Sequence, residues 1–352
     1  MAVNIHIQSV DNSKISSVDF DNLEFGKVFT DHMFECDYID GEWVNPKIVP
    51  YGPLTIDPSA RVFHYGQAVF EGMKAFKDDD DDIFLFRPDE NFSRINVSAA
   101  RLAMPEFNEA FFFEGLKQLL LLDKDWIQKG WGNSMYIRPF VIATEAAISA
   151  SPSSEYKFMI ILSPAQSYYS GDVRVLFAEE YSRSANGGVG FAKAAGNYAA
   201  QFYPTSLAHK RGFQQIIWTD ASSHEFLEEA GTMNIFFRIN DTLITAPNND
   251  RILDGITRKS IIQLAKDSGV DVEIRRVSVA EIKEAARNGS LKEIFGTGTA
   301  AVINPILGFE HSGDNFELPK LEESYASVFK DNLMNIQYNK TDDPHNWRVK
   351  IS

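Results

Sequence analysis

The chain has 352 residues, of which 44% are hydrophobic and 24% charged, and its formal net charge is −15. A length above about 250–300 residues favours two domains over a single core. The negative balance argues against nucleic acid and anionic membranes as partners, because binding phosphates requires a surplus of Lys and Arg. The single cysteine, Cys36, excludes a disulfide framework within the chain. No apolar run approaches a membrane span and the first residues lack a secretion-signal pattern, so we expect a cytoplasmic protein.

The first part of the chain reads as a mixture of strands and helices. The segments FEGMKAFK and DIFLFRP predict two strands joined by the acidic turn 78–82. A run of like charges is far more often a solvated loop than a cation site, so we assign no metal to this turn. Helices are expected from Asp89 to Leu102, where apolar residues recur at helical spacing, and from Glu114 to Lys129, which Gly130 should end.

A pair of strands follows, in SMYIRPFVIAT and YKFMIILSP. Residues 166–172 carry turn-forming and polar side chains without a strong period, and we place an interdomain loop there. The expected organisation is therefore a small N-terminal α/β domain over residues 1–165 and a large C-terminal domain over residues 173–352.

After this loop, strands and helices are again expected, and they would form the second domain. RVLFAEEY and FQQIIWTD predict strands, and the helix between them should end near Arg211. TMNIFFRINDTLITAP predicts a hairpin with Asn240 and Asp241 at its tip. A helix is expected from Ile256 to Ser268, where Gly269 closes it. EIFGTGTAAVINPILGFE then returns to strand around a pair of glycines.

Lys193 stands out because charges are otherwise absent around it. It is the only Asp, Glu, Lys or Arg between Ser184 and His209, and its neighbours are glycines, alanines and Phe191. Desolvation penalises an ammonium among small apolar groups, and a lysine that is easily neutralised is the lysine of Schiff-base chemistry. On spacing alone, a surface lysine on an Ala/Gly-rich loop is the more frequent explanation.

Two segments of the second part have the features of an anion cradle. Gly255, Ile256 and Thr257 lie where a helix begins, and the unpaired N–H groups and helix dipole favour a phosphate there. In GTGTAA, Gly296 and Gly298 allow close approach of the backbone to a ligand. Each feature is weak by itself, because most helix N-termini bind nothing but water.

Glu228 and Glu229 directly precede the expected hairpin. Spacing alone favours a solvated pair at the strand entry. A buried carboxylate at this position would need a cationic partner.

The sequence lacks, or carries outside their usual context, the motifs of three common site types: dinucleotide-binding sites, metal centres and serine-hydrolase active sites. GTGTAA imitates the dinucleotide-binding fingerprint G-x-G-x-x-A, but a strand-like segment follows it instead of a helix, so we reject that interpretation. The seven histidines are scattered, without H-x-x-x-H or H-E-x-x-H, and we expect no metal centre. The absence of G-x-S-x-G argues against a serine hydrolase.

Seven segments follow one another between about Phe25 and Phe309: HYGQAVFEGMKAF, RPDENFSRI, YIRP, GGVGFAKAAGNYAAQ, EEAGTMNIFF, ILDGITRKSI and EIFGTGTA. In this order and at this spacing they resemble the branched-chain amino acid aminotransferases of PLP fold type IV. An ordered set of segments is far more specific than any one motif. The resemblance implies a mixed α+β fold of two domains, each with a mixed β-sheet or barrel-like core and flanking helices. It also implies pyridoxal 5′-phosphate (PLP) as the cofactor.

The resemblance implies roles for the residues at the cofactor. Lys193 is similar to the lysine that holds PLP covalently, and Tyr198 is similar to the phenol that hydrogen-bonds its O3′. Glu229 resembles the carboxylate paired with the pyridine nitrogen, and Arg94 resembles the arginine that binds the phosphate. The remaining cofactor-binding residues that it implies are Thr232, Leu253, Gly255, Ile256, Thr257, Gly298 and Thr299.

The resemblance further implies transamination of L-leucine, L-isoleucine and L-valine with 2-oxoglutarate by a ping-pong mechanism. Arg138, with Tyr65, resembles the group that takes the distal carboxylate of glutamate. The substrate α-carboxylate would lie near Thr232, Thr299 and Ala300. An aromatic wall would surround the aliphatic side chain, formed by Phe25, Tyr65, Phe70, Tyr136 and Tyr168.

Alternatives remain within the same fold. It also hosts D-amino acid aminotransferases, (R)-selective amine aminotransferases and 4-amino-4-deoxychorismate lyase, and a D-amino acid or (R)-amine aminotransferase is the second choice. A non-catalytic protein that merely retains PLP is disfavoured, because Lys193, Tyr198 and Glu229 are all present.

The resemblance also bears on assembly and regulation. It implies a homodimer in which the first domain of one subunit closes part of the other's pocket. Some relatives carry C-x-x-C just after the glycine pair, where this chain has residues 301–304, AVIN. We therefore expect no thiol–disulfide control of activity.

Overall fold

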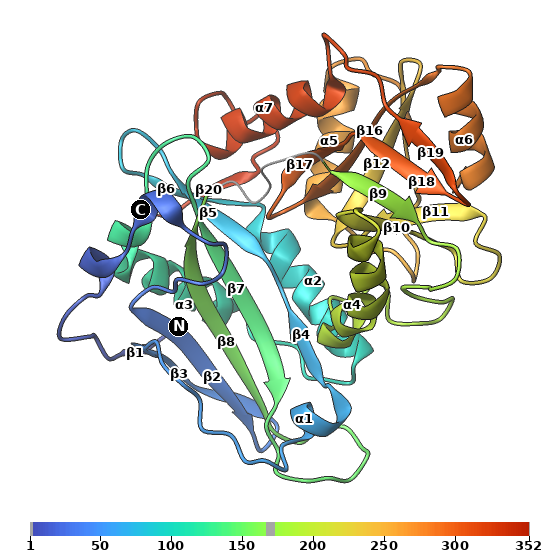
Figure 1. Cartoon of the computed structure of the whole chain (residues 1–352). Helices are drawn as coiled ribbons and strands as arrows, with labels where there is room; N and C mark the ends of the chain where they lie inside the picture. The colour runs from blue at the N-terminus through green and yellow to red at the C-terminus, as the bar shows by residue number, and fades with distance from the viewer. Residues whose placement is uncertain (1–2, 167–172, 352) are drawn as a thin grey trace. The chain divides into compact units, whose positions relative to one another are not determined.

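The computed structural model describes residues 3–166 and 173–351, and the chain divides into two compact units. Unit 1 comprises Met1–Tyr168, Ala192–Gly196 and Ile336–Ser352, and unit 2 comprises Tyr169–Phe191 and Asn197–Asn335. Each unit has its own β-sheet with flanking helices (Figure 1). The expected mixed fold is confirmed.

The sheet of unit 1 has nine strands in the described residues, in the order β1-β3-β2-β8-β7-β5-β6-β20, with β4 paired to β7. The pairs are antiparallel except for β1 with β3, and they include the two expected strand pairs, β5 with β6 and β7 with β8. The strands are β1 (His6–Ile7), β2 (His32–Ile39), β3 (Glu42–Pro50), β4 (Ala68–Phe70), β5 (Met73–Lys77), β6 (Ile83–Phe86), β7 (Ser134–Ala143), β8 (Tyr156–Ala165) and β20 (Arg348–Lys350).

The helices of unit 1 pack on this sheet. The expected apolar stripe of α2 is confirmed, since Ile95 and Ala99 are buried in the core. Close approach of α3 to the sheet depends on Gly115, because a Cβ there would lie 2.5 Å from the Phe34 ring. The helices are α1 (Arg61–Tyr65), α2 (Pro88–Arg101) and α3 (Glu109–Leu122), with short 3₁₀ turns at Ile15–Ser17, Phe20–Asn22 and Lys124–Trp126.

The expected bounds of the second helix, Glu114 to Lys129, are wrong at both ends. Helix α3 begins earlier because the Asn108 side chain accepts the N–H of Phe111 and caps the first turn. It ends at Leu122, and the carboxylate of the C-cap residue, Asp123, accepts the backbone N–H of His32 over 3.1 Å and lies 2.6 Å from Nδ1 of His32.

The C-terminal residues belong to unit 1, whereas the sequence placed them with the large domain. Strand β20 pairs antiparallel with β6, and the Trp347 ring meets Phe86 edge to face at 5.7 Å between centroids. This short return strand completes the sheet edge of unit 1. Ala192–Gly196 joins the same unit through a bridge of Ala194 with Val69.

The acidic turn 78–82 faces lysines. Asp81 pairs with Lys129 at 2.7 Å, and Asp79 and Asp82 pair with Lys340 and Lys350. Two of these lysines belong to the C-terminal segment, so the turn helps to hold that segment on unit 1. In the described residues no group of three His, Cys, Asp or Glu side chains gathers as a metal site.

Unit 2 is built on a sheet that has eleven strands in the described residues. The main path is β14-β13-β12-β11-β10-β9-β18-β19, with β15 paired to β11 and β16 paired to β12 and β17. β9 pairs parallel with β10 and β18, while the expected hairpin, β12 with β13, is antiparallel around Asn240. The strands are β9 (Arg174–Phe177), β10 (Gln215–Thr219), β11 (Phe226–Ala230), β12 (Met233–Ile239), β13 (Thr242–Thr245), β14 (Val272–Ile274), β15 (Val277–Ser278), β16 (Leu291–Gly298), β17 (Val302–Ile306), β18 (Gly308–His311) and β19 (Asp314–Glu317).

Aromatic stacking forms much of the core of unit 2. Phe309 stacks between Phe177 and Phe316, with centroid separations of 4.4 and 4.7 Å. The helix expected from Ile256 to Ser268 is confirmed as α5. The helices that begin in or cross this unit are α4 (Ala195–Lys210), α5 (Ile256–Asp267), α6 (Val279–Arg287) and α7 (Tyr325–Gln337).

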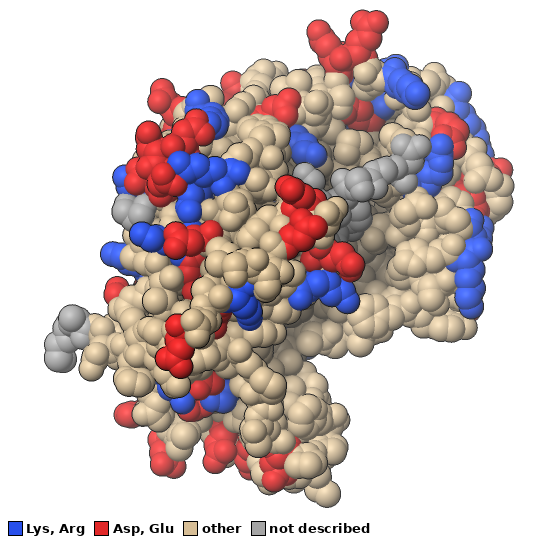
Figure 2. Space-filling view, turned by 60° about the vertical axis from the view of Figure 1, so that its left-hand side comes forward, with Lys and Arg blue, Asp and Glu red and all other residues tan. Residues whose placement is uncertain are grey.

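Charged side chains of both signs are interspersed on the face drawn in Figure 2. No helix within residues 3–166 and 173–351 has the length and apolar character that crossing a membrane requires.

Candidate active site

Lys193 is held in unit 1 by its backbone. Its N–H donates to the Ser98 hydroxyl over 2.8 Å, and its C=O accepts the N–H of Phe70 over 3.1 Å. The following residue, Ala194, bridges to Val69 on β4. The Nζ atom lies 4.7 Å from the centroid of the Phe70 ring, and Lys193 is half-buried. Lys193 is therefore placed against an aromatic face rather than carried on an exposed loop.

Arg94, on α2, is paired with a carboxylate that the sequence analysis did not single out. Its Nε and Nη2 donate to the two oxygens of Glu71 over 2.7 and 2.8 Å, and the Glu71 side chain is fully buried. The Asn91 amide and the Gly72 N–H also donate to this carboxylate. Burial by itself raises the pKa of Glu71, but the charges of Arg94 and Lys193 and the hydrogen bonds outweigh burial. They hold the pKa of Glu71 below its ordinary value.

Four of the residues expected around the substrate form one chain of contacts in unit 1. The rings of Phe25 and Tyr136 meet edge to face at 4.9 Å between centroids. Arg138 donates from Nη2 to the Tyr136 hydroxyl over 3.2 Å, and its guanidinium carbon lies 4.6 Å from the centroid of the Phe70 ring. An aromatic surface with one guanidinium beside it suits an aliphatic side chain and also a second carboxylate.

Two expected wall residues are not part of this chain of contacts. Tyr65 ends helix α1 and is 45% exposed, and its hydroxyl donates to the Ile148 carbonyl. Tyr168 lies outside the described residues. Phe63 and Tyr65 on α1 and Ile148 are all exposed, and we call these three residues the α1 patch.

Glu228 and Glu229 are both buried on strand β11 of unit 2, so the interpretation as a solvated pair is wrong. Adjacent strand residues face opposite sides of the sheet, and each carboxylate has its own arginine. Glu229 lies 2.6 Å from Nε of Arg183 and accepts the N–H of Leu253 over 3.2 Å. Glu228 pairs with Arg251; burial raises the pKa of Glu228 despite this arginine.

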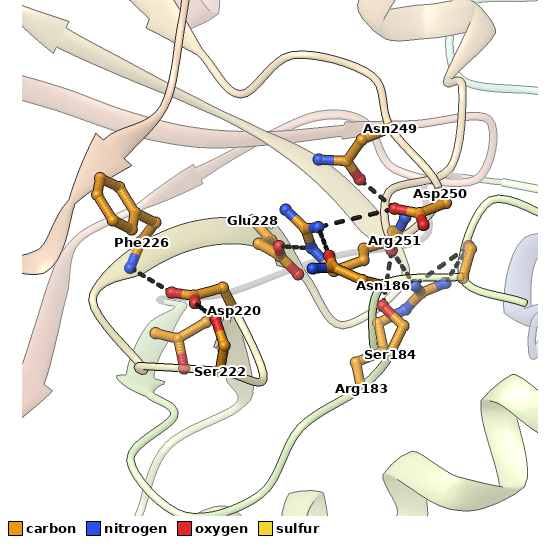
Figure 3. Close-up of polar contacts among 12 residues, drawn as sticks. Arg183, Ser184, Asn186, Asp220, Ser222, Phe226, Glu228, Asn249, Asp250 and Arg251 are labelled. Atoms are coloured by element: carbon orange, nitrogen blue, oxygen red, sulfur yellow. Dashed lines mark hydrogen bonds and ion pairs between the residues drawn. The ribbon is translucent and has the colours of Figure 1, made fainter. Parts of the chain in front are cut away.

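Arg251 ties two loops of unit 2 together (Figure 3). Its carbonyl accepts from Nη1 of Arg183 over 2.8 Å and from the Ser184 hydroxyl over 2.9 Å, while its side chain reaches Glu228. Arg183 also donates to the carbonyl of Gly190 over 3.2 Å. The loop that leads to the lysine segment is thus bound to the turn that leads to α5.

A row of polar side chains crosses three strands beside the start of α5. Glu229 on β11 pairs with Asn234 on β12, which pairs with Thr297 on β16, so the three side chains share one face of the sheet. Asn234 donates to the Leu253 carbonyl over 2.9 Å, and a Cβ on Gly255 would collide with the Asn234 amide oxygen. The Thr297 hydroxyl is buried without a hydrogen-bond partner within the described part of the chain.

The start of helix α5 is the place where an anion cradle is expected. Gly255 is its N-cap and supplies no side-chain hydrogen bond, so no side chain at this cap satisfies the N–H groups of the first turn. Ile256 and Thr257 open the helix and are buried. A helix start of this kind, with the buried Thr297 hydroxyl in the same unit, suits a phosphate.

The other expected residues of unit 2 lie on turns and on α4. Thr232 is exposed between β11 and β12, and Thr299 and Ala300 are half-buried after Gly298 at the end of β16. A Cβ on Gly298 would lie 3.5 Å from the Thr232 carbonyl oxygen, so these two turns approach closely. Tyr198 lies on α4 and is half-buried.

Replacing Gly190 by alanine should destabilise the protein. The added Cβ would lie 2.5 Å from the Arg251 carbonyl oxygen and 2.7 Å from its Cα, so backbone must move, and we expect the free energy of unfolding to fall by about 2 kcal/mol. Gly196→Ala is the matched control on the other side of Lys193, because a Cβ there meets nothing within 4 Å. Urea denaturation measures both variants, and equal midpoints would contradict this description of the loop.

The Glu71–Arg94 pair should make stability depend on pH. A carboxyl whose pKa is lowered on folding stabilises the protein above its unfolded pKa, near 4.3, and this contribution is lost as the pH falls through the folded pKa. We therefore expect Glu71→Gln to lower the free energy of unfolding by about 3 kcal/mol at pH 7. The deficit relative to wild type should shrink below about pH 4. A deficit that denaturation curves show to be the same at all pH values would mean that charge is not its cause.

Comparison with known proteins assigns the family. Residues 68–309 match the model of the amino-transferase class IV family. The chain is 48% identical over 336 residues to a probable branched-chain-amino-acid aminotransferase of Staphylococcus epidermidis, and 46% identical over 336 residues to branched-chain-amino-acid transaminase 1 of Bacillus subtilis; each match covers 94% of both chains. The crystal structure of a branched-chain aminotransferase from Thermoproteus uzoniensis with norvaline has the same fold, with a TM-score of 0.74 and 21% identity over 91% of this chain and 100% of that one. The chain therefore belongs to the class IV aminotransferases and, within them, to the branched-chain amino acid aminotransferases.

Proposed function

We propose that this protein transfers the amino group of L-leucine, L-isoleucine or L-valine to 2-oxoglutarate, yielding a branched-chain 2-oxo acid and L-glutamate. The relatives at 48% and 46% identity are named for branched-chain substrates. One observation carries the proposal: the Phe70 ring has the Lys193 ammonium 4.7 Å and the Arg138 guanidinium 4.6 Å from its centroid. The amine of Lys193, the apolar ring of Phe70 and the guanidinium of Arg138 therefore lie together. An aliphatic amino acid requires the first two groups, and glutamate also requires the guanidinium for its second carboxylate.

PLP, the cofactor of this family, acts as an electron sink for the substrate Cα when it is bound. Each unit, taken by itself, has polar groups that suit a part of this cofactor. The uncapped start of α5 and the buried Thr297 hydroxyl suit its phosphate, as does the guanidinium of Arg94. The buried Glu229 carboxylate suits a protonated pyridine nitrogen, because opposite charges favour each other's ionised form. The Lys193 amine suits its aldehyde.

We assign the remaining contacts by the pattern of the family. Tyr198 would donate to the O3′ oxygen. The substrate α-carboxylate would be held by Thr232 and by the Thr299–Ala300 turn, and Arg138 would meet the second carboxylate of glutamate. The phosphate cradle would be completed by backbone and side-chain groups of Leu253, Gly255, Ile256, Thr257, Gly298 and Thr299.

Lys193 is the proton carrier in this proposal. With the cofactor bound, the Lys193 amine would act as the general base that accepts the proton of the substrate Cα and would carry a proton back during the reverse half-reaction. The face of the Phe70 ring lies beside Nζ of this amine, at 4.7 Å from the ring centroid. Arg183, 2.6 Å from Glu229, supplies the buried carboxylate with a countercharge.

An amino-group transfer assay tests the proposal. L-leucine, L-isoleucine and L-valine with 2-oxoglutarate should each yield L-glutamate, while D-alanine should not react. Lys193→Ala should lower kcat by at least about 10³-fold, since it removes the group that moves the proton. The D-amino acid alternative is not favoured by the relatives, and turnover of D-alanine in preference to L-leucine would restore it.

We propose that the protein is a homodimer. Phe63, Tyr65 and Ile148 of the α1 patch are exposed at 60%, 45% and 69%, and a second copy would cover these apolar side chains. Tyr65, which is outside the contact chain of its own unit, would then close the partner's pocket. Light scattering should give twice the chain mass of 39.6 kDa, and Ile148→Asp should shift it toward the monomer. A wild-type protein that stays monomeric at micromolar concentration would contradict the proposal.

We further propose that transamination by this protein is insensitive to mild thiol oxidants. We also propose that the protein works in the cytoplasm. Cys36 is fully buried, and burial raises the pKa of its thiol to about 12, so little reactive thiolate forms at neutral pH. Transamination rates before and after treatment with hydrogen peroxide should agree within about 20%. Oxidant-sensitive turnover that persists in Cys36→Ser would contradict the proposal, and cell fractionation checks the location.

A further inference from the structure

Ser98 connects the backbones of Arg94 and Lys193. It lies one turn after Arg94 on α2, and its side chain is fully buried. The hydroxyl donates to the Arg94 carbonyl over 2.9 Å and accepts the N–H of Lys193 over 2.8 Å. One oxygen therefore joins the helix that carries Arg94 to the segment that carries Lys193.

The Lys193 peptide is fixed from two sides. On one side the Ser98 hydroxyl takes its N–H, and on the other the Phe70 N–H donates to its carbonyl over 3.1 Å. The bridge between Val69 and Ala194 sets the register of this segment along β4. Without the hydroxyl, the backbone of Lys193 would lose this hydrogen bond at a part-buried position, which is unfavourable.

Binding of PLP would depend on the separation between the side chains of Lys193 and Arg94. The aldehyde and the phosphate of PLP are attached to one rigid ring, so the distance between them is nearly fixed. Lys193, which would bind the aldehyde, and Arg94, which would bind the phosphate, must therefore be held at a separation that fits this distance. A binding arrangement must be held within about 0.5 Å of its productive geometry, so a misplacement of about 1 Å would weaken the attachment of the cofactor. We propose that Ser98 is a positioning residue that sets Lys193 relative to Arg94; this inference rests on the proposed function.

The reaction that Ser98 would govern is the attachment of the cofactor. The Lys193 amine adds to the aldehyde carbon, a C=N bond forms, and the aldehyde oxygen leaves as water with two protons from nitrogen. Pyridoxamine 5′-phosphate carries an amine in place of the aldehyde and cannot form this bond. It occupies the same site through its ring and phosphate alone, so it reports on the pocket without the lysine.

The test compares these two ligands on the apoprotein of Ser98→Ala. The PLP concentration that half-saturates the visible absorbance of the lysine-linked cofactor should rise about tenfold or more, as expected for an unmade buried hydrogen bond. The dissociation constant of pyridoxamine 5′-phosphate, measured by calorimetry, should change less than about threefold. Ser98→Cys nearly keeps the side-chain volume while weakening the acceptor, and should shift PLP loading in the same direction.

Ser268→Ala is the matched control. Its hydroxyl makes the same type of bond to the carbonyl four residues earlier, Leu264, at the far end of α5, and its loss should change neither ligand. The inference fails if Ser98→Ala loads PLP like wild type, or if both ligands weaken by the same factor, as general loosening would cause. A wild-type protein without lysine-linked absorbance would refute the proposed function instead.

Discussion

The arrangement of this protein depends on pairing charges that are removed from water. Arg94 is matched to Glu71 in unit 1, and Glu229 is matched to Arg183 in unit 2, at 2.7 and 2.6 Å. An unpaired charge at either place would be strongly destabilising, and each pair is formed by residues of one unit. The groups proposed to meet the phosphate and the pyridine are therefore held by the fold itself.

Backbone contacts on both sides of Lys193 fix the position of this residue. The chain passes from unit 2 into unit 1 at Ala192 and returns after Gly196. Gly190 lies against the Arg251 backbone on the side of unit 2, and Ser98 and Phe70 hold Lys193 on the side of unit 1. The small residues around Lys193 thus serve two purposes, because they allow close backbone approach and leave the lysine as the one charge in its stretch.

Local signals in the sequence predicted much of this fold. Hydrophobic period and turn residues predicted the hairpin around Asn240 and the apolar stripe of α2. The isolated charge made Lys193 a candidate, but only the family resemblance assigned it a role. Glu71 has a weaker signal: it is the only acid between His64 and Lys77, but Lys74 lies three residues away. Its partner, Arg94, is 23 residues away in the sequence. The roles of Ser98 and Asn234, and the return of β20 to unit 1, depend on contacts between distant segments that no local pattern contains. The bounds of α3 were missed because the cap at Asn108 was not recognised.

The central claim is that a covalent bond forms between the Nζ of Lys193 and the PLP aldehyde. Borohydride reduction of the protein with PLP, followed by proteolysis and mass spectrometry of the peptides, tests it most directly. The account predicts one phosphopyridoxyl group, on the peptide that contains Lys193. A label on a different lysine, or no label at all, would contradict it.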